Sequence, residues 1–287
     1  MARVLVCGAG GFIGRHVVAQ LRAAGHIVVE GRSQQLEFAR CTEPKAWLRH
    51  LQGIDAVINA VGVLRDSRQR PMEAVHTQAP VALFEACAQA GIRRVIHVSA
   101  LGIVGSDTLY ARSKLAADDA LLALREQGRL DATVLRPSIV FGRGGASSQL
   151  FMSLARLPVL VLPAAALRAR VQPVAVQDLA LAISRLLEES GPAQLCAVGP
   201  RPLSLADFIA TLRAQSTRPA AQVLALPDGP SRWSARLGDR VPGQPWCSET
   251  LDLLQRDNIG DVDPLARLLG RPPIAPERLV KQAWSAA

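Results

Sequence analysis

Short apolar runs alternate with helical patterns over the first half of the chain. The apolar runs lie at residues 3–7, 27–30, 56–60, 95–99 and 132–135, and the helical patterns at 15–24, 43–51, 72–90 and 110–127. Apolar runs this short, separated by helices, are typical of parallel strands that are covered on both faces. The pattern therefore predicts an α/β fold with a doubly wound parallel sheet.

The alternation weakens after residue 137. A helical pattern at 149–157, a strand-like run at 171–174 and a helix at 178–189 follow, and residues 200–287 are richer in proline with several short helical patterns. We expect a large domain over residues 1–199, which contributes to a substrate cleft from about residue 140. Residues 200–287 are expected to form a small C-terminal subdomain on the substrate side.

Gly8, Gly11 and Gly14 lie three residues apart between the first predicted strand and the first predicted helix. In this position one glycine allows a tight turn, one lets a pyrophosphate approach the backbone, and one lets the helix pack closely on the strand. Phe12 and Ile13 of this loop are candidate cofactor-binding residues, and the helix start that follows supplies N–H groups and partial positive charge for a phosphate. The loop therefore predicts dinucleotide binding.

The end of the second strand indicates which dinucleotide binds. A carboxylate there would bond the ribose hydroxyls of NAD, whereas an arginine meets the 2′-phosphate of NADP. Arg32, followed by Ser33, stands where the carboxylate would be expected, so NADP(H) is favoured over NAD(H). Glu30 is the rival carboxylate, although the alternation of side chains along a strand can turn it to the other face.

Tyr110 is the single tyrosine of the chain, and Lys114 is one of only three lysines among 33 basic residues. Residues four apart lie on one face of a helix, so both side chains can point into one cleft. A nearby ammonium favours the phenolate and lowers the pKa of a phenol from its usual value of about 10. The pair is therefore interpreted as a proton donor and acceptor.

The composition of the chain restricts which partners, cofactors and cellular locations are expected. The net charge of +9 raises nucleic acid as a partner, but the arginines are dispersed and few aromatic residues accompany them, so we expect a small-molecule partner instead. Five scattered cysteines without a CxxC pair argue against a disulfide framework and a metal site. The longest apolar stretch, 157–167, is interrupted by prolines, so no integral membrane segment is expected. The N-terminus has no signal-like region, and a cytoplasmic location is expected.

Motifs along most of the chain carry a family resemblance. They are the glycine loop, Gly53-Ile-Asp-Ala-Val-Ile-Asn59, His97-Val-Ser-Ala-Leu-Gly102, Tyr110-Ala-Arg-Ser-Lys114, Leu135-Arg-Pro-Ser-Ile-Val-Phe-Gly142, Gln172-Pro-Val-Ala-Val-Gln-Asp178 and Leu254-Gln-Arg-Asp-Asn-Ile259. With these motifs the chain resembles the extended, atypical branch of the short-chain dehydrogenase/reductase superfamily, which is NAD-dependent epimerase/dehydratase-like. In particular, it resembles the dinucleotide-binding accessory subunit of respiratory complex I.

The resemblance implies a Rossmann-type fold and a set of site residues. Tyr110 would be the catalytic acid and base, Lys114 would hold the ribose, and Ser99 would lie near the substrate oxygen. The cofactor would be lined by Asn59, Ala60, Val61 and Gly62, with Pro137 and Ser138 bordering the nicotinamide. For Asn59, an asparagine that holds a turn at the strand end is an equal alternative.

One departure leaves two functions open. In sugar-nucleotide members of the superfamily the catalytic hydroxyl falls one position after Ser99, where this chain has Ala100. The first hypothesis is an NADP(H)-dependent oxidoreductase or nucleotide-sugar epimerase/dehydratase that uses Tyr110 and Lys114, with an unknown substrate. The second is a non-catalytic or weakly catalytic dinucleotide-holding redox or assembly protein. The resemblance implies either a homodimer or a respiratory-complex partner.

Overall fold

The computed structural model of the chain describes residues 1–31, 37–241 and 246–285. The strands are β1 (Arg3–Cys7), β2 (Ile27–Gly31), β3 (Ala56–Asn59), β4 (Arg94–Val98), β5 (Asp131–Pro137), β6 (Val140–Phe141), β7 (Val159–Pro163), β8 (Arg170–Val171), β9 (Val174–Ala175), β10 (Gln194–Ala197), β11 (Leu203–Ser204) and β12 (Gln222–Leu226). The α-helices are α1 (Phe12–Ala23), α2 (Pro44–Leu48), α3 (Ala79–Gln89), α4 (Leu109–Glu126), α5 (Ala146–Leu154), α6 (Ala164–Arg168), α7 (Val176–Glu188), α8 (Leu205–Ala214), α9 (Asp228–Asp239), α10 (Ser248–Leu253), α11 (Asp263–Leu269) and α12 (Leu279–Ser285). Short 3₁₀ turns form η1 (Phe38–Arg40) and η3 (Pro276–Arg278), and η2 (Ala74–Gln78) is a π-helical turn.

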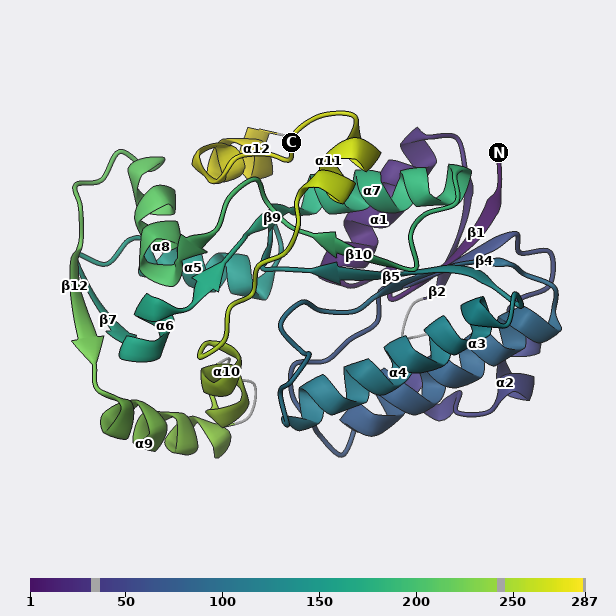
Figure 1. Cartoon of the computed structure of the whole chain (residues 1–287), viewed down its shortest axis with the longest axis horizontal. Coiled ribbons are helices and arrows are strands. Elements are labelled where there is room, and N and C mark those ends of the chain that lie inside the picture. The colour runs from purple at the N-terminus through teal and green to yellow at the C-terminus, as the bar shows by residue number, and fades with distance from the viewer. Residues whose placement is uncertain (32–36, 242–245, 286–287) are drawn as a thin grey trace. The chain divides into compact units, whose positions relative to one another are not determined.

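A six-stranded sheet in the order β10-β5-β4-β3-β1-β2 forms the centre of the fold. Neighbouring strands from β2 to β5 pair in parallel. Helices α3 and α4 lie on one face of this sheet, and α1 and α7 lie on the other (Figure 1). Strand β3 is buried along its whole length, as expected of a strand covered on both faces. The predicted doubly wound α/β fold is confirmed.

The strand order places the loops that follow β1 and β3 at the carboxyl ends of adjacent strands. From β1 the chain moves outward to β2 and then returns to β3 on the other side of β1, so the loops that follow β1 and β3 diverge. In open α/β sheets, ligands bind at the carboxyl ends of the strands where the order reverses in this way. The register pairs Cys7 with Asn59 and Asn59 with His97, so the ends of β1, β3 and β4 are level.

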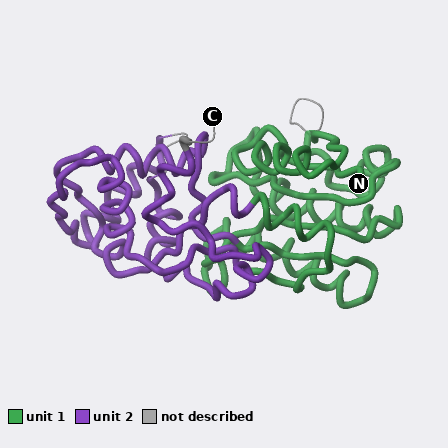
Figure 2. The backbone as a smooth tube through the Cα atoms, turned by 90° about the horizontal axis from the view of Figure 1, so that it is seen from above, with its two compact units in different colours: residues 1–136, 180–195 green, residues 137–179, 196–287 purple. Residues whose placement is uncertain are grey.

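The chain divides into two compact units that differ from the expected boundary at residue 199. The first unit contains residues 1–136 and 180–195, and the second contains residues 137–179 and 196–287 (Figure 2). The segment 137–179 therefore belongs with the C-terminal part of the chain. A single cut in the sequence cannot describe this arrangement, because the chain enters the second unit twice.

The second unit has its own hydrophobic core. The ring of Phe208 packs edge-on against Phe141 and Phe151, with ring centroids 6.0 and 5.4 Å apart. Three two-stranded pairings surround this core: β11 with β8, β12 with β7, and β6 with β9. The strand expected at 171–174 is two short strands, β8 and β9, because Gln172 and Pro173 separate them.

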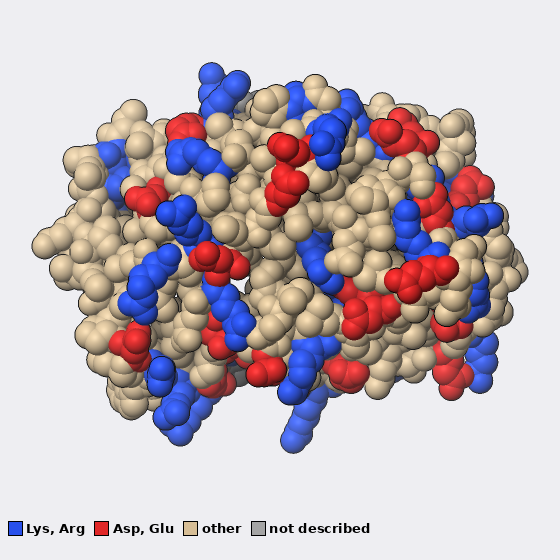
Figure 3. Space-filling model, in the orientation of Figure 1, with Lys and Arg blue, Asp and Glu red and all other residues tan. Residues whose placement is uncertain are grey.

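Basic and acidic side chains are interspersed on the face of the molecule drawn in Figure 3. None of the helices in the described ranges is long and apolar enough to cross a bilayer. Within the same ranges, no group of three or more His, Cys, Asp and Glu side chains is placed to hold a metal ion.

Candidate functional site

The glycine loop closes tightly on itself at the start of α1. Gly8 has a φ of +81°, which favours glycine, and its carbonyl oxygen accepts a hydrogen bond from the Gly11 N–H at 2.9 Å. A Cβ on Gly14 would lie 2.0 Å from the same oxygen, so only glycine lets the helix approach the loop this closely. Gly10, by contrast, faces open space. No side chain of the described residues caps α1, and its first turn carries no acidic residue. These features fit a dinucleotide phosphate at the helix start.

The glycine loop lies against the end of β3. A Cβ on Gly8 would stand 3.0 Å from the carbonyl of Ala60 and 3.1 Å from the Val61 side chain. Buried Asn59 shapes this turn, because its Oδ1 accepts a hydrogen bond from the Val61 N–H at 3.1 Å. This is the turn-holding role that the sequence offered as the alternative to a cofactor contact. The structure thus brings the predicted residues of the first and third strand ends together.

Helix α4 presents the Tyr110 and Lys114 pair. Thr108 caps the helix, since its hydroxyl accepts a hydrogen bond from the Ala111 N–H at 3.2 Å, and this sets where the helix begins. Tyr110 is half-buried, whereas Lys114 is 4% exposed and donates to the Val98 carbonyl at 3.1 Å. A Cβ on Gly62 would lie 3.5 Å from the Lys114 Nζ. The ammonium therefore lies beside the turn that follows β3.

A π-helical turn brings His76 into the same cluster. The Ala79 N–H bonds the Ala74 carbonyl, five residues back, and Pro80 has no N–H to continue the α-helical ladder. His76 Nε2 accepts a hydrogen bond from the Val63 N–H at 2.9 Å, so the proton of the neutral ring is on Nδ1, which lies 3.1 Å from the Ser113 Oγ. The sequence pattern predicted an uninterrupted helix over 72–90 and assigned His76 no role.

His76 connects the turn after β3 to α4. Its ring meets the Tyr110 ring edge-on, with centroids 5.4 Å apart. Ser113, which His76 contacts, also donates from its hydroxyl to the Tyr110 carbonyl at 3.1 Å, and its own carbonyl accepts from Thr77 at 2.9 Å. The first turns of α4 are therefore held from two sides, and the orientation of Tyr110 is restricted by contacts on both its ring and its backbone.

Burial sets the protonation of this cluster. It lowers the pKa of Lys114 to about 8, although the nearby Asp118 carboxylate opposes the change. The pKa of His76 falls to about 3, first because of burial and then because of the Lys114 charge. His76 is therefore neutral at physiological pH, and Lys114 is the group of this pair that titrates near neutrality.

Asp118 is a fully buried carboxylate one turn further along α4. Its Oδ2 accepts hydrogen bonds at 2.9 Å from the Ser99 hydroxyl and from Arg136. Burial raises the pKa of Asp118, and the Ser99 bond and the Arg136 charge oppose this rise. The hydroxyl proton of Ser99 is thus directed at α4. Ser99 was expected beside a substrate oxygen, and in this structure its proton serves an internal contact.

His97 joins the two polar clusters. The Asn59 oxygen is used by a backbone N–H, so the amide nitrogen is the donor to His97 Nδ1 at 3.1 Å. The neutral ring then carries its proton on Nε2, which lies 3.6 Å from Asp118 Oδ1. Burial, reinforced by Lys114, lowers the pKa of His97 well below its usual value. A neutral His97 between Asn59 and Asp118 therefore links the end of β3 to α4.

The remaining predicted residues either lie outside the described ranges or have contacts of their own. Arg32 and Ser33 fall outside the described residues. The rival carboxylate Glu30 bonds Arg22 of α1 at 2.7 Å. Pro137 and Ser138 begin the second unit, where the Ser138 hydroxyl donates to the Asn258 carbonyl at 3.0 Å.

The sequence did not reveal the roles of His76, His97 and Asp118. Asp118 lies at i+4 from Lys114 on α4, so it continues the face that carries Tyr110. This spacing was the one feature of the sequence that could have indicated a role for Asp118. The contacts of the two histidines join residues far apart in the chain, and no local pattern reports them.

Known proteins are similar to this chain in sequence and in fold. Residues 4–199 match the model of the NAD dependent epimerase/dehydratase family. The chain is 26% identical over 277 residues to subunit 9 of the NADH dehydrogenase (ubiquinone) 1 alpha subcomplex of Rattus norvegicus mitochondria, covering 90% of this chain and 72% of that protein. It is 33% identical over 177 residues to the dTDP-4-dehydrorhamnose reductase of Mycolicibacterium smegmatis. That match covers 54% of this chain and half of the reductase, 50%.

Two of the solved structures with this fold hold a nicotinamide dinucleotide. RMD from Pseudomonas aeruginosa, complexed with NADPH, superposes with a TM-score of 0.71 at 18% identity and covers 99% of this chain and 98% of that chain. The UDP-glucose 4-epimerase of Thermus thermophilus, complexed with NAD, gives a TM-score of 0.69 at 19% identity, with coverage of 99% and 100%. The chain has the Rossmann-type sheet and the glycine loop, and the family model matches it over residues 4–199. The chain therefore belongs to the NAD dependent epimerase/dehydratase family.

Proposed function

We propose that this protein is an NADP(H)-dependent oxidoreductase in which Tyr110 exchanges a proton with the substrate and Lys114 assists it. The observation that carries the proposal is the position of Lys114. Its buried ammonium lies 3.5 Å from where a Gly62 Cβ would be, at the turn against which the glycine loop packs. A cation in this position is suited both to hold a ribose and to act on the phenol one helical turn away.

The residues present fit a nicotinamide dinucleotide. The glycine loop would hold the pyrophosphate, the turn from Ala60 to Gly62 would line the cofactor, and Lys114 would bond the ribose. When bound, the cofactor supplies or accepts the hydride. The chain's own contribution is to orient the reactants and to hold the transferred proton at the Tyr110 hydroxyl.

Lys114 and His76 prepare Tyr110 for this role. A cationic Lys114 favours loss of the phenolic proton, and it is the one cation of the pair because His76 is neutral. The edge-on contact of the two rings restricts where the hydroxyl can point. We assign Ser99 a positioning role, because its proton is given to Asp118 and the next residue is Ala100.

Reduction of a carbonyl is the reaction that we favour for this site. The 33% identity to a dTDP-4-dehydrorhamnose reductase and the 30% identity to the ceramide reductase of Caulobacter vibrioides support a reductase. A nucleotide-sugar epimerase or dehydratase would use the same proton exchange at Tyr110. We expect the second unit to determine the substrate, and the reductase match, which covers 54% of this chain, does not identify it.

The test is turnover with Tyr110→Phe. With a panel of carbonyl and nucleotide-sugar substrates, the wild type should oxidise NADPH, and the variant should be slower by about 10²–10⁴-fold, the usual contribution of a general acid or base. Because the ring contacts are retained, NADPH should bind both proteins with similar affinity. Wild-type turnover that survives in Tyr110→Phe would refute the role of this residue.

Cofactor choice is tested by titration with NADPH and NADH. The wild type should prefer NADPH, and Arg32→Asp should remove that preference. Glu30→Gln is the control, since the Glu30 carboxylate already bonds Arg22 and its loss should leave the ratio of affinities unchanged. A ratio that changes in Glu30→Gln and not in Arg32→Asp would make Glu30 the determinant and NAD(H) the cofactor.

A dinucleotide-holding protein without turnover is the second candidate. Two observations favour it. The Ser99 hydroxyl donates its hydrogen bond to Asp118. The chain is also 26% identical to the complex I subunit, in a match that covers 90% of this chain. In that case NADPH would remain bound and unoxidised with every substrate, and a partner protein would co-purify. Turnover that Tyr110→Phe abolishes would exclude this candidate.

A further inference from the structure

Helix α9 in the second unit exposes its large side chains and buries its small ones. Ser231 and Ala235 are buried, whereas Trp233 is 66% exposed and Leu237 is 40% exposed. A helix that only packs on its own core would show the opposite distribution. The outward side of α9 therefore has the composition of a contact surface.

This surface has two parallel rows, because its residues repeat at intervals of four. The cationic row is Arg232, Arg236 and Arg240, all exposed. The apolar row lies one position later and is Trp233, Leu237 and Val241, with Val241 47% exposed. Residues four apart are neighbours on a helix surface, so the first two members of each row are adjacent along α9. Arg240 and Val241 directly follow the end of the helix at Asp239. We call these six residues the α9 outer face.

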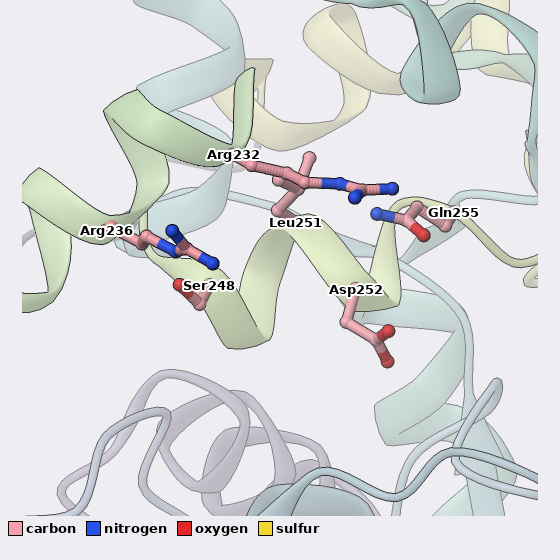
Figure 4. A pocket seen from close by; sticks show the side chains of 6 residues that line it. All are labelled: Arg232, Arg236, Ser248, Leu251, Asp252 and Gln255. Atoms are coloured by element: carbon pink, nitrogen blue, oxygen red, sulfur yellow. The ribbon is translucent and has the colours of Figure 1, made fainter. Parts of the chain in front are cut away.

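The cationic row borders two adjoining pockets. A pocket of about 290 Å³ is lined by Arg232, Arg236, Ser248, Leu251, Asp252 and Gln255. In Figure 4 the guanidinium group of Arg232 extends towards Gln255, and the Asp252 carboxylate points away from both arginines. A second pocket of about 180 Å³ shares Arg232 and Gln255 with the first and adds Ala165, Arg168 and Asp228.

The arginines of these pockets have their charges available. Among the residues that the structure describes, no carboxylate lies within ion-pair distance of Arg168, Arg232 or Arg236. Ser248, by contrast, donates its hydroxyl proton to Asp239 at 2.6 Å. Unpaired guanidinium groups beside a cavity are suited to a phosphate group, which they bind in a bidentate manner.

The strands that precede α9 add further exposed apolar surface. Val161 of β7 and Leu224 of β12 are register partners, and they are 57% and 45% exposed. Val159 of β7 is 41% exposed. Partners in a parallel pair point to the same side of the sheet, so these side chains form an apolar face of their own.

We propose that the α9 outer face docks on an anionic phospholipid bilayer. Trp233 and Leu237 would enter the interface between headgroups and acyl chains, while the arginine row would bind lipid phosphates, one of them in the pocket of Figure 4. An apolar row beside a cationic row, with tryptophan in it, is the composition of helices that lie in the plane of a membrane surface. This docking is independent of the reaction proposed for the first unit.

Flotation of the full-length protein with vesicles tests the proposal. The wild type should bind vesicles that contain phosphatidylglycerol at least tenfold more tightly than vesicles of phosphatidylcholine alone. Arg232→Gln combined with Arg236→Gln and Arg240→Gln should weaken binding to the anionic vesicles by between about tenfold and a hundredfold. Trp233→Ser should weaken it while leaving the salt dependence unchanged, because it removes an apolar contact and no charge.

The matched control changes three exposed arginines of the first unit, Arg68, Arg93 and Arg129, to Gln. This variant has the same net charge as the α9 triple variant, and it should bind anionic vesicles within about twofold of the wild type. Equal loss in both triple variants would show a non-specific charge effect and overturn the proposal. Absence of wild-type binding to anionic vesicles would overturn it as well, and binding of inorganic phosphate without vesicle binding would assign the pockets to a soluble anion instead.

Discussion

Asp118→Asn tests the polar cluster that supports α4. The substitution keeps the shape of the side chain and removes its charge. Arg136, whose side chain is 13% exposed, then loses its carboxylate partner, and the Ser99 hydroxyl loses a charged acceptor. The change is confined to the interior, because Asp118 itself is fully buried.

The structure indicates how much stability Asp118→Asn should lose. Removing one partner of a buried ion pair costs about 3–5 kcal/mol, because the other charge is left without compensation. This is a large part of the ~5–15 kcal/mol by which a folded domain is stable. At about 2–4 °C for each kcal/mol, the melting temperature should fall by roughly 6–20 °C. The pKa of Lys114 should also fall below its value of about 8, since the Asp118 charge is what raises it.

Asp119→Asn is the control, because Asp119 is the next residue on the same helix, carries the same charge and is exposed. The free energy of unfolding of the Asp119→Asn protein should differ from that of the wild type by less than about 0.5 kcal/mol. Thermal unfolding followed by circular dichroism measures both variants. The double variant Asp118→Asn with Arg136→Met, which removes both charges, should recover part of the loss. Equal melting temperatures for Asp118→Asn and Asp119→Asn would refute the buried ion pair.

Two further predictions concern the cofactor site. In protein labelled with ¹³C-lysine, the ε-carbon signal of Lys114 should titrate near pH 8, and cofactor affinity should fall as the pH rises through that value because the ammonium form is lost; a Lys114 signal that titrates only above about pH 10 would contradict the burial argument. Gly14→Ala should destabilise the fold and prevent cofactor binding, since the added Cβ would lie 2.0 Å from a backbone oxygen, whereas Gly10→Ala faces open space and should fold normally. Equal melting temperatures for these two variants would show that the loop relaxes around the added methyl group.

The sequence alone determined the fold class, and it indicated the glycine loop and the Tyr110–Lys114 pair of the candidate site. The alternation of strands and helices is a local property, so β1 to β5 were predicted close to their observed bounds. The glycine spacing and the Tyr110–Lys114 interval are also local, because turns and helix faces depend on residues only a few positions apart. The family resemblance followed from the same short motifs and is confirmed by the match over residues 4–199.

Only the tertiary structure decided which residues surround Lys114 and how the chain divides. His76, Ser99 and Asp118 are far apart in sequence and come together because η2 and the end of β4 both pack against α4, and the pKa of Lys114 follows from the burial there. Proline at position 80 produces a π-helical turn because it removes one backbone donor, and a periodic apolar pattern does not report such a change. The two-unit division and the exposed rows of α9 likewise depend on which surfaces are covered, which is set by contacts distant in the sequence.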